Sequence, residues 1–362
     1  MINNFKIFKK KKILITGHTG FKGSWLVIWL KLYKAKIIGV SNEIPTKPSN
    51  YLINHVAKDI VDLRADVRDL NKIKKIILKY KPDFIFHLAA QSLVKTSYKN
   101  PIYTWQTNLN GTLNILESLR YLKKKCTAII VTSDKCYKNI EKKSGYIEND
   151  QLSGDDPYSA SKASAEILCN SYFKSFFIKK NVQICTVRAG NVIGGGDWSK
   201  DRLIPDCVRF WSKNKKVIIR SPNSTRPWQH VFEALFGYLI LATRVRSDKT
   251  LNGQSFNFGP SKNKNYSVIR VIKTVRKFWT QVKYIIKKDN FFNETNILNL
   301  NTHKVKKILK WNCILKFEEM ILILTEWYKC FYNDKKNILN FSKKQILYYE
   351  SLIERRNNEI LK

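Results

Sequence analysis

Short apolar runs alternate with amphipathic stretches through the first half of this chain. Mostly apolar runs, which indicate buried strands, occupy residues 13–16, 37–40, 84–88, 128–132 and 182–187. Between them, apolar side chains recur at helical spacing, first over residues 25–32 and again over residues 73–80. Alternating strands and helices build a parallel sheet with helices on both faces. The pattern therefore predicts an α/β fold with a doubly wound, Rossmann-type parallel sheet.

The pattern changes after Arg188. Loop residues cluster at 194–198 and 221–224, and the segments between them are shorter and more mixed. One more apolar strand is expected at residues 255–258, and the tail from Lys335 has the spacing of a helix. We predict a sheet domain over residues 1–187, with a returning segment around 228–260. A smaller lobe with a helical tail would take up most of residues 188–362.

The chain is strongly basic, with 66 Lys and Arg residues against 28 Asp and Glu and a formal net charge of +38. Such a balance can indicate a nucleic-acid or other polyanion partner. Here the lysines form small clusters along the whole chain and no single basic arm, and Asn and Ile are abundant as well. We interpret the charge as solvated surface and expect no nucleic-acid partner. A polyanion-binding protein remains the alternative.

Neither metal binding nor a membrane span is predicted. The seven cysteines include no Cys-x-x-Cys pair, and the five histidines are dispersed, so neither a disulfide framework nor a zinc site fits. The basic N-terminus leads directly into the first strand and lacks the apolar stretch of a secretion signal. No run approaches the ~18 apolar residues of a membrane span. We expect a cytoplasmic protein without a membrane partner.

A glycine-rich segment, residues 17–23, lies between the first strand and the first helix. Glycines there allow a tight turn and a close approach to a pyrophosphate, whose charge the helix N-terminus favours. Asp66 could lie near an adenine amino group, and small residues at the end of the strand at 84–88 leave room for a ribose. The predicted cofactor contacts are Gly17, His18, Gly20, Phe21, Lys22, Gly23, Asp66, Val67, Leu88, Ala89, Ala90, Tyr158 and Lys162.

Two points about this site stay open. The second strand ends without the acidic residue that usually binds the adenosine ribose, so both NAD and NADP fit. His18 could stack near the cofactor or cap the turn.

Tyr158 and Lys162 are four residues apart and share one face of a helix. A lysine ammonium can lower the pKa of a neighbouring tyrosine, whose phenolate then accepts a proton from a substrate alcohol. Ser133, at the end of an apolar strand, can hydrogen-bond to the same alcohol. The set predicts hydride chemistry on an alcohol, which a non-catalytic dinucleotide sensor would not need.

Together these motifs resemble the extended short-chain dehydrogenase/reductase family over essentially the whole chain. Within it, Ser133-Asp134-Lys135 resembles the nucleotide-sugar 4,6-dehydratases. Segments 17–26, 133–137, 190–198 and 226–231 are similar to those of CDP-glucose 4,6-dehydratases. The resemblance implies a hydro-lyase that converts CDP-D-glucose to CDP-4-keto-6-deoxy-D-glucose through bound NAD. It also implies a homodimer and a supply of deoxysugars for surface polysaccharide such as lipopolysaccharide O-antigen.

The resemblance assigns roles to the catalytic residues Ser133, Asp134, Lys135, Tyr158 and Lys162. Tyr158 would take the proton of the sugar C4 hydroxyl, and Asp134 would protonate the departing C6 hydroxyl. Lys135 would be the C5 base or would only position Asp134. dTDP-glucose 4,6-dehydratases carry Glu at that position, and a lysine base must be neutral, which needs burial or nearby positive charge.

The second lobe is expected to bind the nucleotide diphosphate, because guanidinium groups match phosphate oxygens. The predicted substrate contacts are Gln91, Asn191, Arg202, Arg226 and His230, while Arg188 and Asp197 are expected to form structural ion pairs. The alternatives within the enzyme class are a dehydratase or 4-epimerase of another nucleotide sugar, linked to dTDP or UDP.

Overall fold

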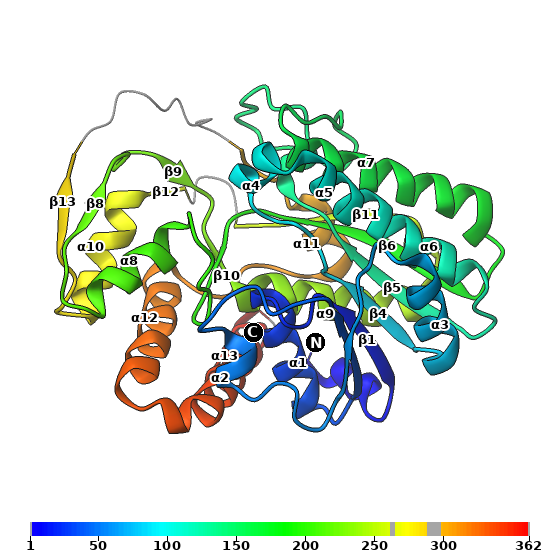
Figure 1. Ribbon diagram of the computed structural model, residues 1–362, viewed down its shortest axis with the longest axis horizontal. Coiled ribbons are helices and arrows are strands. Elements are labelled where there is room, and N and C mark those ends of the chain that lie inside the picture. Colours follow the sequence, from blue (N-terminus) through cyan, green and yellow to red (C-terminus); the bar gives the residue numbers. More distant parts are fainter. Residues whose placement is uncertain (1, 261–264, 288–297, 361–362) are drawn as a thin grey trace.

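A seven-stranded parallel sheet forms the centre of the molecule (Figure 1). The structure is a computed structural model that describes residues 2–260, 265–287 and 298–360. Within these ranges the strand order is β3-β2-β1-β4-β5-β6-β11. The strands are β1 (Lys12–Thr16), β2 (Lys36–Ser41), β3 (Val61–Arg64), β4 (Phe84–His87), β5 (Cys126–Val131), β6 (Val182–Ala189) and β11 (Ser255–Phe258). The order reverses direction between β1 and β4, as in Rossmann-type folds, so the predicted fold class is confirmed.

All six strands that the sequence predicts are present, with ends shifted by at most two residues. β3 is the strand that the hydrophobic pattern missed. It lies at the edge of the sheet beside β2, and three of its four residues are exposed. An edge strand with solvent on most of its surface carries little apolar signal, although its backbone still pairs in register from Val61 to Arg64.

Helices cover both faces of the sheet, as strand alternation requires. Leu14 and Ile130 point to the face covered by α3 (Leu70–Tyr80), α6 (Gly111–Arg120) and α7 (Pro157–Tyr172). Ile13 and Ile129 belong to the opposite core, which contains α1 and α9. The remaining helices are α1 (Phe21–Leu32), α2 (Asn50–Ile53), α4 (Val94–Lys99), α5 (Pro101–Trp105), α8 (Leu203–Trp211), α9 (Val231–Ser247), α10 (Val268–Phe278), α11 (His303–Leu309), α12 (Phe317–Asn333) and α13 (Ile338–Ile360).

Short 3₁₀- and π-helical segments complete the element order: η1 (Ile2–Phe8), η2 (Gln106–Asn110), η3 (Asp134–Cys136), η4 (Phe173–Phe177), η5 (Lys249–Leu251) and η6 (Lys335–Asn337). Among the described residues, no helix combines the length and the apolar character that a bilayer crossing demands.

The second lobe contains three short strand pairs. These pairs are β7 (Val192–Ile193) with β10 (Gln229–His230), β9 (Thr225–Arg226) with β12 (Tyr266–Ser267), and β8 (Val217–Ile219) with β13 (Tyr284–Ile286). α10 packs against α12 in the same lobe. The connections that carry these pairs start from the carboxyl ends of the sheet strands, so the lobe faces the edge of the sheet where ligands bind.

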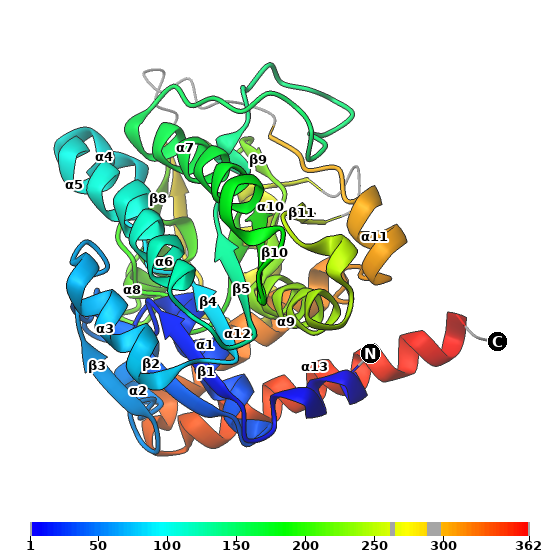
Figure 2. The same ribbon diagram turned by 90° about the vertical axis from the view of Figure 1, so that its right-hand side faces the viewer.

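The helical tail returns to the sheet domain (Figure 2). Trp29 of α1 donates to Glu350 of α13 at 2.7 Å, and the ring of Tyr349 packs against the same tryptophan with centroids 5.8 Å apart. The segment around residues 228–260 likewise supplies α9 and β11 to the sheet domain. The division at residue 187 stays a prediction, but the tail lies on the sheet domain as its last element.

Candidate active site

The glycine-rich segment forms a tight loop at the point where the strand order reverses. Gly17 has φ of +74°, and a Cβ there would lie 2.7 Å from the backbone nitrogen of Ala89. A Cβ on Gly23 would lie 2.1 Å from the carbonyl oxygen of Gly17. α1 then begins with Gly20 as its N-cap, without a side-chain cap and without an acidic residue in its first turn. Its N-terminal N–H groups can therefore receive an anion.

His18 does not face this loop's ligand side. Its ring is fully buried, with Nε2 2.7 Å from Oδ1 of Asp62 and Nδ1 2.9 Å from Oγ of Ser41. A Cβ on Gly39 would lie 2.4 Å from the ring, so the ring is packed against β2. Burial lowers the pKa of His18. The side chain ties the loop to β2 and β3, so it neither stacks on a cofactor nor caps the turn, and a cofactor contact through the backbone of His18 stays a prediction.

The other predicted cofactor residues lie around the same edge of the sheet. The backbone N–H of Ala89 donates to Oγ1 of Thr16 at 3.2 Å, which holds residues 88–90 against the end of β1. Val67 is buried beside Gly111. The Asp66 carboxylate accepts from Arg68 at 2.7 Å, and hydrogen bonds from Arg68 hold its pKa below the usual range. An adenine amino group would share this carboxylate with Arg68.

Tyr158 and Lys162 lie on the first turns of α7, as predicted. Asp156 caps the helix by accepting from the backbone N–H of Tyr158 at 2.9 Å. Lys162 donates through Nζ to the carbonyl of Val131 at 3.1 Å, which fixes it at the end of β5. Burial lowers the pKa of Lys162 to about 8.

Burial raises the pKa of Tyr158 to about 12, because a buried phenolate is poorly solvated. A hydrogen bond from Ser133 and the positive charge of Arg202 oppose this rise. The sequence predicted that the ammonium of Lys162 would lower this pKa. Arg202, which comes from the second lobe, is therefore a source of positive charge near the phenol that the helix spacing could not indicate.

The predicted acid Asp134 is almost fully buried at the start of η3, directly after β5. Its Oδ1 accepts from Oγ of Ser133 at 2.9 Å. Its Oδ2 would lie 3.0 Å from a Cβ on Gly190, so the missing side chain makes room for the carboxylate. Burial lowers the pKa of Lys22 to about 8, and the negative charge of Asp134 works in the opposite direction. Lys22 of the glycine-rich loop thus lies in the electrostatic neighbourhood of the predicted acid.

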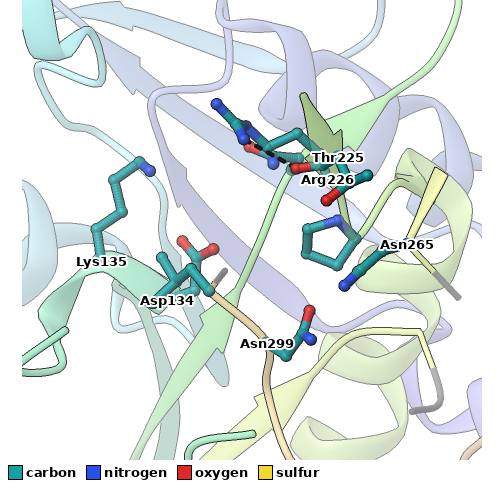
Figure 3. A pocket seen from close by; sticks show the side chains of 9 residues that line it. Asp134, Lys135, Thr225, Arg226, Asn265 and Asn299 are labelled. Carbon is teal, nitrogen blue, oxygen red and sulfur yellow. Dashed lines mark hydrogen bonds between the residues drawn. The ribbon is translucent and has the colours of Figure 1, made fainter. Parts of the chain in front are cut away.

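A pocket opens in front of Asp134 (Figure 3). Asp134 and Lys135 form one side of it, and Arg226 lies across the space. Asn191 also lines the pocket, so residues predicted from three separate motifs share one cavity. The remaining lining residues are Thr225, Pro227, Asn265, Leu298 and Asn299. The last three come from segments without a recognisable motif, and the sequence did not point to them.

Two predicted substrate contacts are engaged in local structure. The Gln91 side chain accepts from the backbone N–H of Leu93 at 2.6 Å and donates to Thr104 at 2.9 Å, so it organises the loop before α4. Arg202 pairs with Asp197 at 2.9 Å, which makes Asp197 the structural partner that the sequence predicted.

His230, a predicted substrate contact, also has a structural role. Its side chain is buried, its Nδ1 accepts from the backbone N–H of Phe232 at 3.3 Å, and its ring packs on that phenylalanine with centroids 4.4 Å apart. It caps α9 and is not among the residues that line the pocket of Figure 3. His230 also lines a second pocket, with Trp228 and Tyr266, so its part in substrate binding stays a prediction.

A buried ion pair supports the catalytic helix. Arg188 of β6 lies 2.7 Å from Glu166, which follows Lys162 by one helical turn. Oγ1 of Thr186 also donates to Glu166, at 2.7 Å, and Thr132 donates to it as well. Burial alone would raise the pKa of Glu166, but the charge and the hydrogen bond of Arg188 hold it below its ordinary value. The sequence predicted Arg188 as a structural partner but did not identify Glu166.

The sequence matches the family model described as GDP-mannose 4,6 dehydratase over residues 14–324. The chain belongs to this family. CDP-glucose 4,6-dehydratase of Salmonella typhimurium is 38% identical to this family member over 351 residues, which cover 95% of this chain and 98% of the relative. CDP-paratose 2-epimerase of Salmonella typhi is 31% identical over 292 residues, 74% of this chain and 84% of the relative.

Solved structures agree on the fold of this family member. An epimerase from Methanothermobacter thermautotrophicus superimposes with a TM-score of 0.80 at 20% identity, covering 92% of this chain and 97% of the other. A Bacillus anthracis dTDP-glucose 4,6-dehydratase in complex with NAD gives a TM-score of 0.72 at 22% identity, covering 90% and 98%. The predicted resemblance to nucleotide-sugar 4,6-dehydratases is confirmed at the level of the family.

Proposed function

We propose that the protein is a hydro-lyase that converts CDP-D-glucose to CDP-4-keto-6-deoxy-D-glucose and water with bound NAD. The observation that carries the proposal is the position of Asp134 and Lys135, which line one pocket with Arg226. A simple oxidoreductase of this fold needs only the tyrosine and lysine of α7 and has no use for a buried acid beside them. The 38% identity to a CDP-glucose 4,6-dehydratase supports the choice of sugar nucleotide.

The residues at the sheet edge fit a dinucleotide. The backbone cradle at Gly17 has no space for a Cβ, and the N-terminus of α1 lacks a side-chain cap. Gly20, Gly23 and the first turn of α1 would hold the pyrophosphate. Residues 88–90 would border a ribose. When bound, NAD supplies a reversible hydride acceptor, and a relative of the same fold has been solved with NAD.

Side chains of the protein would then accept and donate the protons of the reaction. Tyr158 would take the proton of the C4 hydroxyl, while the hydrogen on C4 would leave as a hydride for the dinucleotide. Ser133 would hydrogen-bond to the same hydroxyl oxygen. The C4 ketone acidifies the C5 hydrogen. Asp134 donates a proton to the C6 hydroxyl, which leaves as water. A base would take the C5 proton and return it once a hydride is restored at C6, so the reaction would be a net loss of one water. Arg226 would bind the diphosphate across the pocket.

The experiment is to incubate purified protein with NAD and with CDP-, dTDP- or UDP-glucose. We expect a 4-keto-6-deoxy product from CDP-glucose in preference to the other two. Asp134→Asn should stall after oxidation and accumulate reduced cofactor, because the amide cannot protonate the leaving hydroxyl. Asp59→Asn, at a carboxylate that is 70% exposed, is the matched control. Turnover restricted to 4-epimerisation, or no product from CDP-glucose, would refute the proposal.

Two roles for Lys135 can be separated with Lys135→Met. If Lys135 is the C5 base, the variant should still reduce the cofactor but should not exchange the C5 hydrogen for deuterium from the solvent. If Lys135 only positions Asp134, exchange at C5 should persist while water loss slows. Either result leaves the identity of the substrate untouched, so this test is independent of the first.

Dimerisation is part of the same proposal. α4, α5 and α7 pack together and present apolar side chains to solvent, among them Tyr98, Ile102 and Ile167. Ile102 is 72% exposed, and a second copy that covers this face would bury it. We expect Ile102→Asp with Ile167→Asp to halve the mass measured by light scattering, while Ile140→Asp, at an isoleucine that is 67% exposed, leaves it unchanged. A wild-type monomer would contradict the dimer. A cytoplasmic location and a part in O-antigen supply stay predictions.

A further inference from the structure

The outer edge of the second lobe carries a two-stranded sheet with one open face. β8 and β13 pair in parallel, with Ile218 opposite Ile285, and lie at the left edge of Figure 1. Val217 and Ile219, the neighbours of Ile218 in β8, are buried toward the lobe's interior, whereas Ile286, next to Ile285 in β13, is 47% exposed. Ile218 is 51% exposed and Ile285 is 42% exposed. Two aliphatic side chains thus stand next to each other on a solvent-facing surface, where an apolar pair has no partner in the described chain.

Cations flank both isoleucines in the same register. Lys216 and Arg220 lie two residues before and after Ile218, and Lys283 and Lys287 stand in the same relation to Ile285. All four are exposed. Side chains two apart in a strand point to the same face.

Backbone hydrogen bonds hold β8 and β13 in register at both ends of the strand pair. The N–H of Val217 donates to the carbonyl of Lys283 at 3.1 Å, and the N–H of Lys287 donates to the carbonyl of Ile219 at 3.1 Å. We call this surface the basic face; its members are Lys216, Ile218, Arg220, Lys283, Ile285 and Lys287.

Acidic residues are sparse in the sequence around this charge. Residues 207–230 and 265–287 contain twelve Lys and Arg and no Asp or Glu. In the described part of the chain, no carboxylate forms an ion pair with any of the four cations of the basic face. Lys277 of α10, by contrast, is paired with Glu318 at 3.0 Å. The basic face is therefore a site of positive potential even on a basic protein.

We propose that the basic face docks the protein on an anionic lipid surface. Apolar side chains that enter the headgroup region, surrounded by Lys and Arg that reach the phosphates, are the pattern of peripheral membrane contacts. Long basic side chains can keep their charge at the phosphates while their stems cover apolar surface. Single-stranded nucleic acid would instead favour aromatic side chains that stack on bases. The sequence-based expectation of no membrane partner rested on the lack of a spanning segment, which this contact does not need.

The test uses the full-length protein and vesicles of phosphatidylcholine with or without 30% phosphatidylglycerol, separated by flotation. We expect binding only to the anionic vesicles, and release at 0.5 M NaCl. Each basic residue near an anionic surface contributes about 1 kcal/mol, which is about fivefold in the partition coefficient. Lys216→Ser with Lys283→Ser should therefore lower partitioning about 25-fold. Ile218→Ser with Ile285→Ser should also lower it severalfold, although the net charge is unchanged.

Matched controls separate the basic face from the overall charge. Lys123→Ser with Lys179→Ser removes two exposed cations of the sheet domain, and Ile140→Ser removes an exposed isoleucine. These variants should bind as the wild type does, and all variants should keep the wild-type unfolding midpoint. Failure of the wild type to bind anionic vesicles overturns the proposal. So does an equal loss in the lysine control, or tighter binding to a DNA duplex that the same Lys216 and Lys283 changes abolish.

Discussion

Removing one partner of the buried pair Glu166–Arg188 should destabilise the protein strongly. The two side chains are 2% and 3% exposed and 2.7 Å apart, and Glu166 also accepts from Thr186. Glu166→Gln keeps the shape of the side chain but leaves the guanidinium buried without a negative partner. Breaking a buried pair in this way costs about 3–5 kcal/mol. At roughly 2.1 cal/mol/K of unfolding entropy per residue, that loss corresponds to a fall in Tm of about 4–7 °C for this chain.

The substitution should also change the active site in a way that a purely structural loss would not. The negative charge of Glu166 is the largest influence that opposes the burial-induced fall in the pKa of Lys162. Without it, the ammonium is less favoured, so its pKa falls further below about 8. We expect the alkaline limb of the kcat/KM profile to move to lower pH, because the protonated lysine is lost earlier.

Denaturant unfolding of the wild type, Glu166→Gln, Arg188→Met and the double variant gives the coupling energy of the pair. We expect the double variant to be less destabilised than the sum of the single ones. Glu318→Gln is the matched control: its ion pair with Lys277 is 64% and 62% exposed, and should be worth less than about 1 kcal/mol. If Glu166→Gln costs no more than that control, or leaves the alkaline limb in place, the reasoning is wrong.

Three further perturbations test other parts of the structure. Gly190→Ala places a Cβ 3.0 Å from Oδ2 of Asp134 and should lower kcat about tenfold at unchanged KM and stability; an unchanged kcat would show that the acid tolerates displacement. Gly17→Ala, at φ of +74°, should weaken NAD binding at least about tenfold in a titration and cost about 1 kcal/mol of unfolding free energy; wild-type affinity would argue against the cradle. Burial lowers the pKa of His87 and of His230 to about 3, so between pH 7 and 5 only the unfolded chain takes up these protons. Stability should therefore fall by about 2 kcal/mol per histidine on acidification, and His87→Gln should remove its share in urea titrations at the two pH values.

The strands, the first helices and the glycine-rich loop could be predicted because each carries a local signal. A buried parallel strand is a continuous apolar run, and the order of strands and helices then limits the topology. β3 carried no such signal, since most of its surface faces solvent. The helix face shared by Tyr158 and Lys162 was predictable for the same reason, because four residues make one turn.

Roles that depend on long-range contacts could not be predicted. Whether His18 faces a cofactor or a core is decided by Asp62, which lies 44 residues away. His230 is a local exception: it accepts from Phe232, two residues on, yet its motif position gave the same expectation as that of Arg226. The pocket is completed by Asn265 and Asn299, which reach it through the fold of the second lobe. The spacing of residues in the sequence carries no information about contacts between segments that are far apart along the chain.

The order in which the chain is synthesised sets a constraint on how this domain matures. Tyr349 packs against Trp29, Phe232 and Phe236, with ring centroids 5.6–5.9 Å apart. A ribosome makes that tyrosine well after Trp29, Phe232 and Phe236, so the aromatic surface of α1 and α9 stays uncovered until α13 has been made. A nascent chain that stalls before α13 exposes this surface to aggregation and to chaperones. Premature termination near residue 338 would therefore be damaging even though every predicted catalytic residue had already been made.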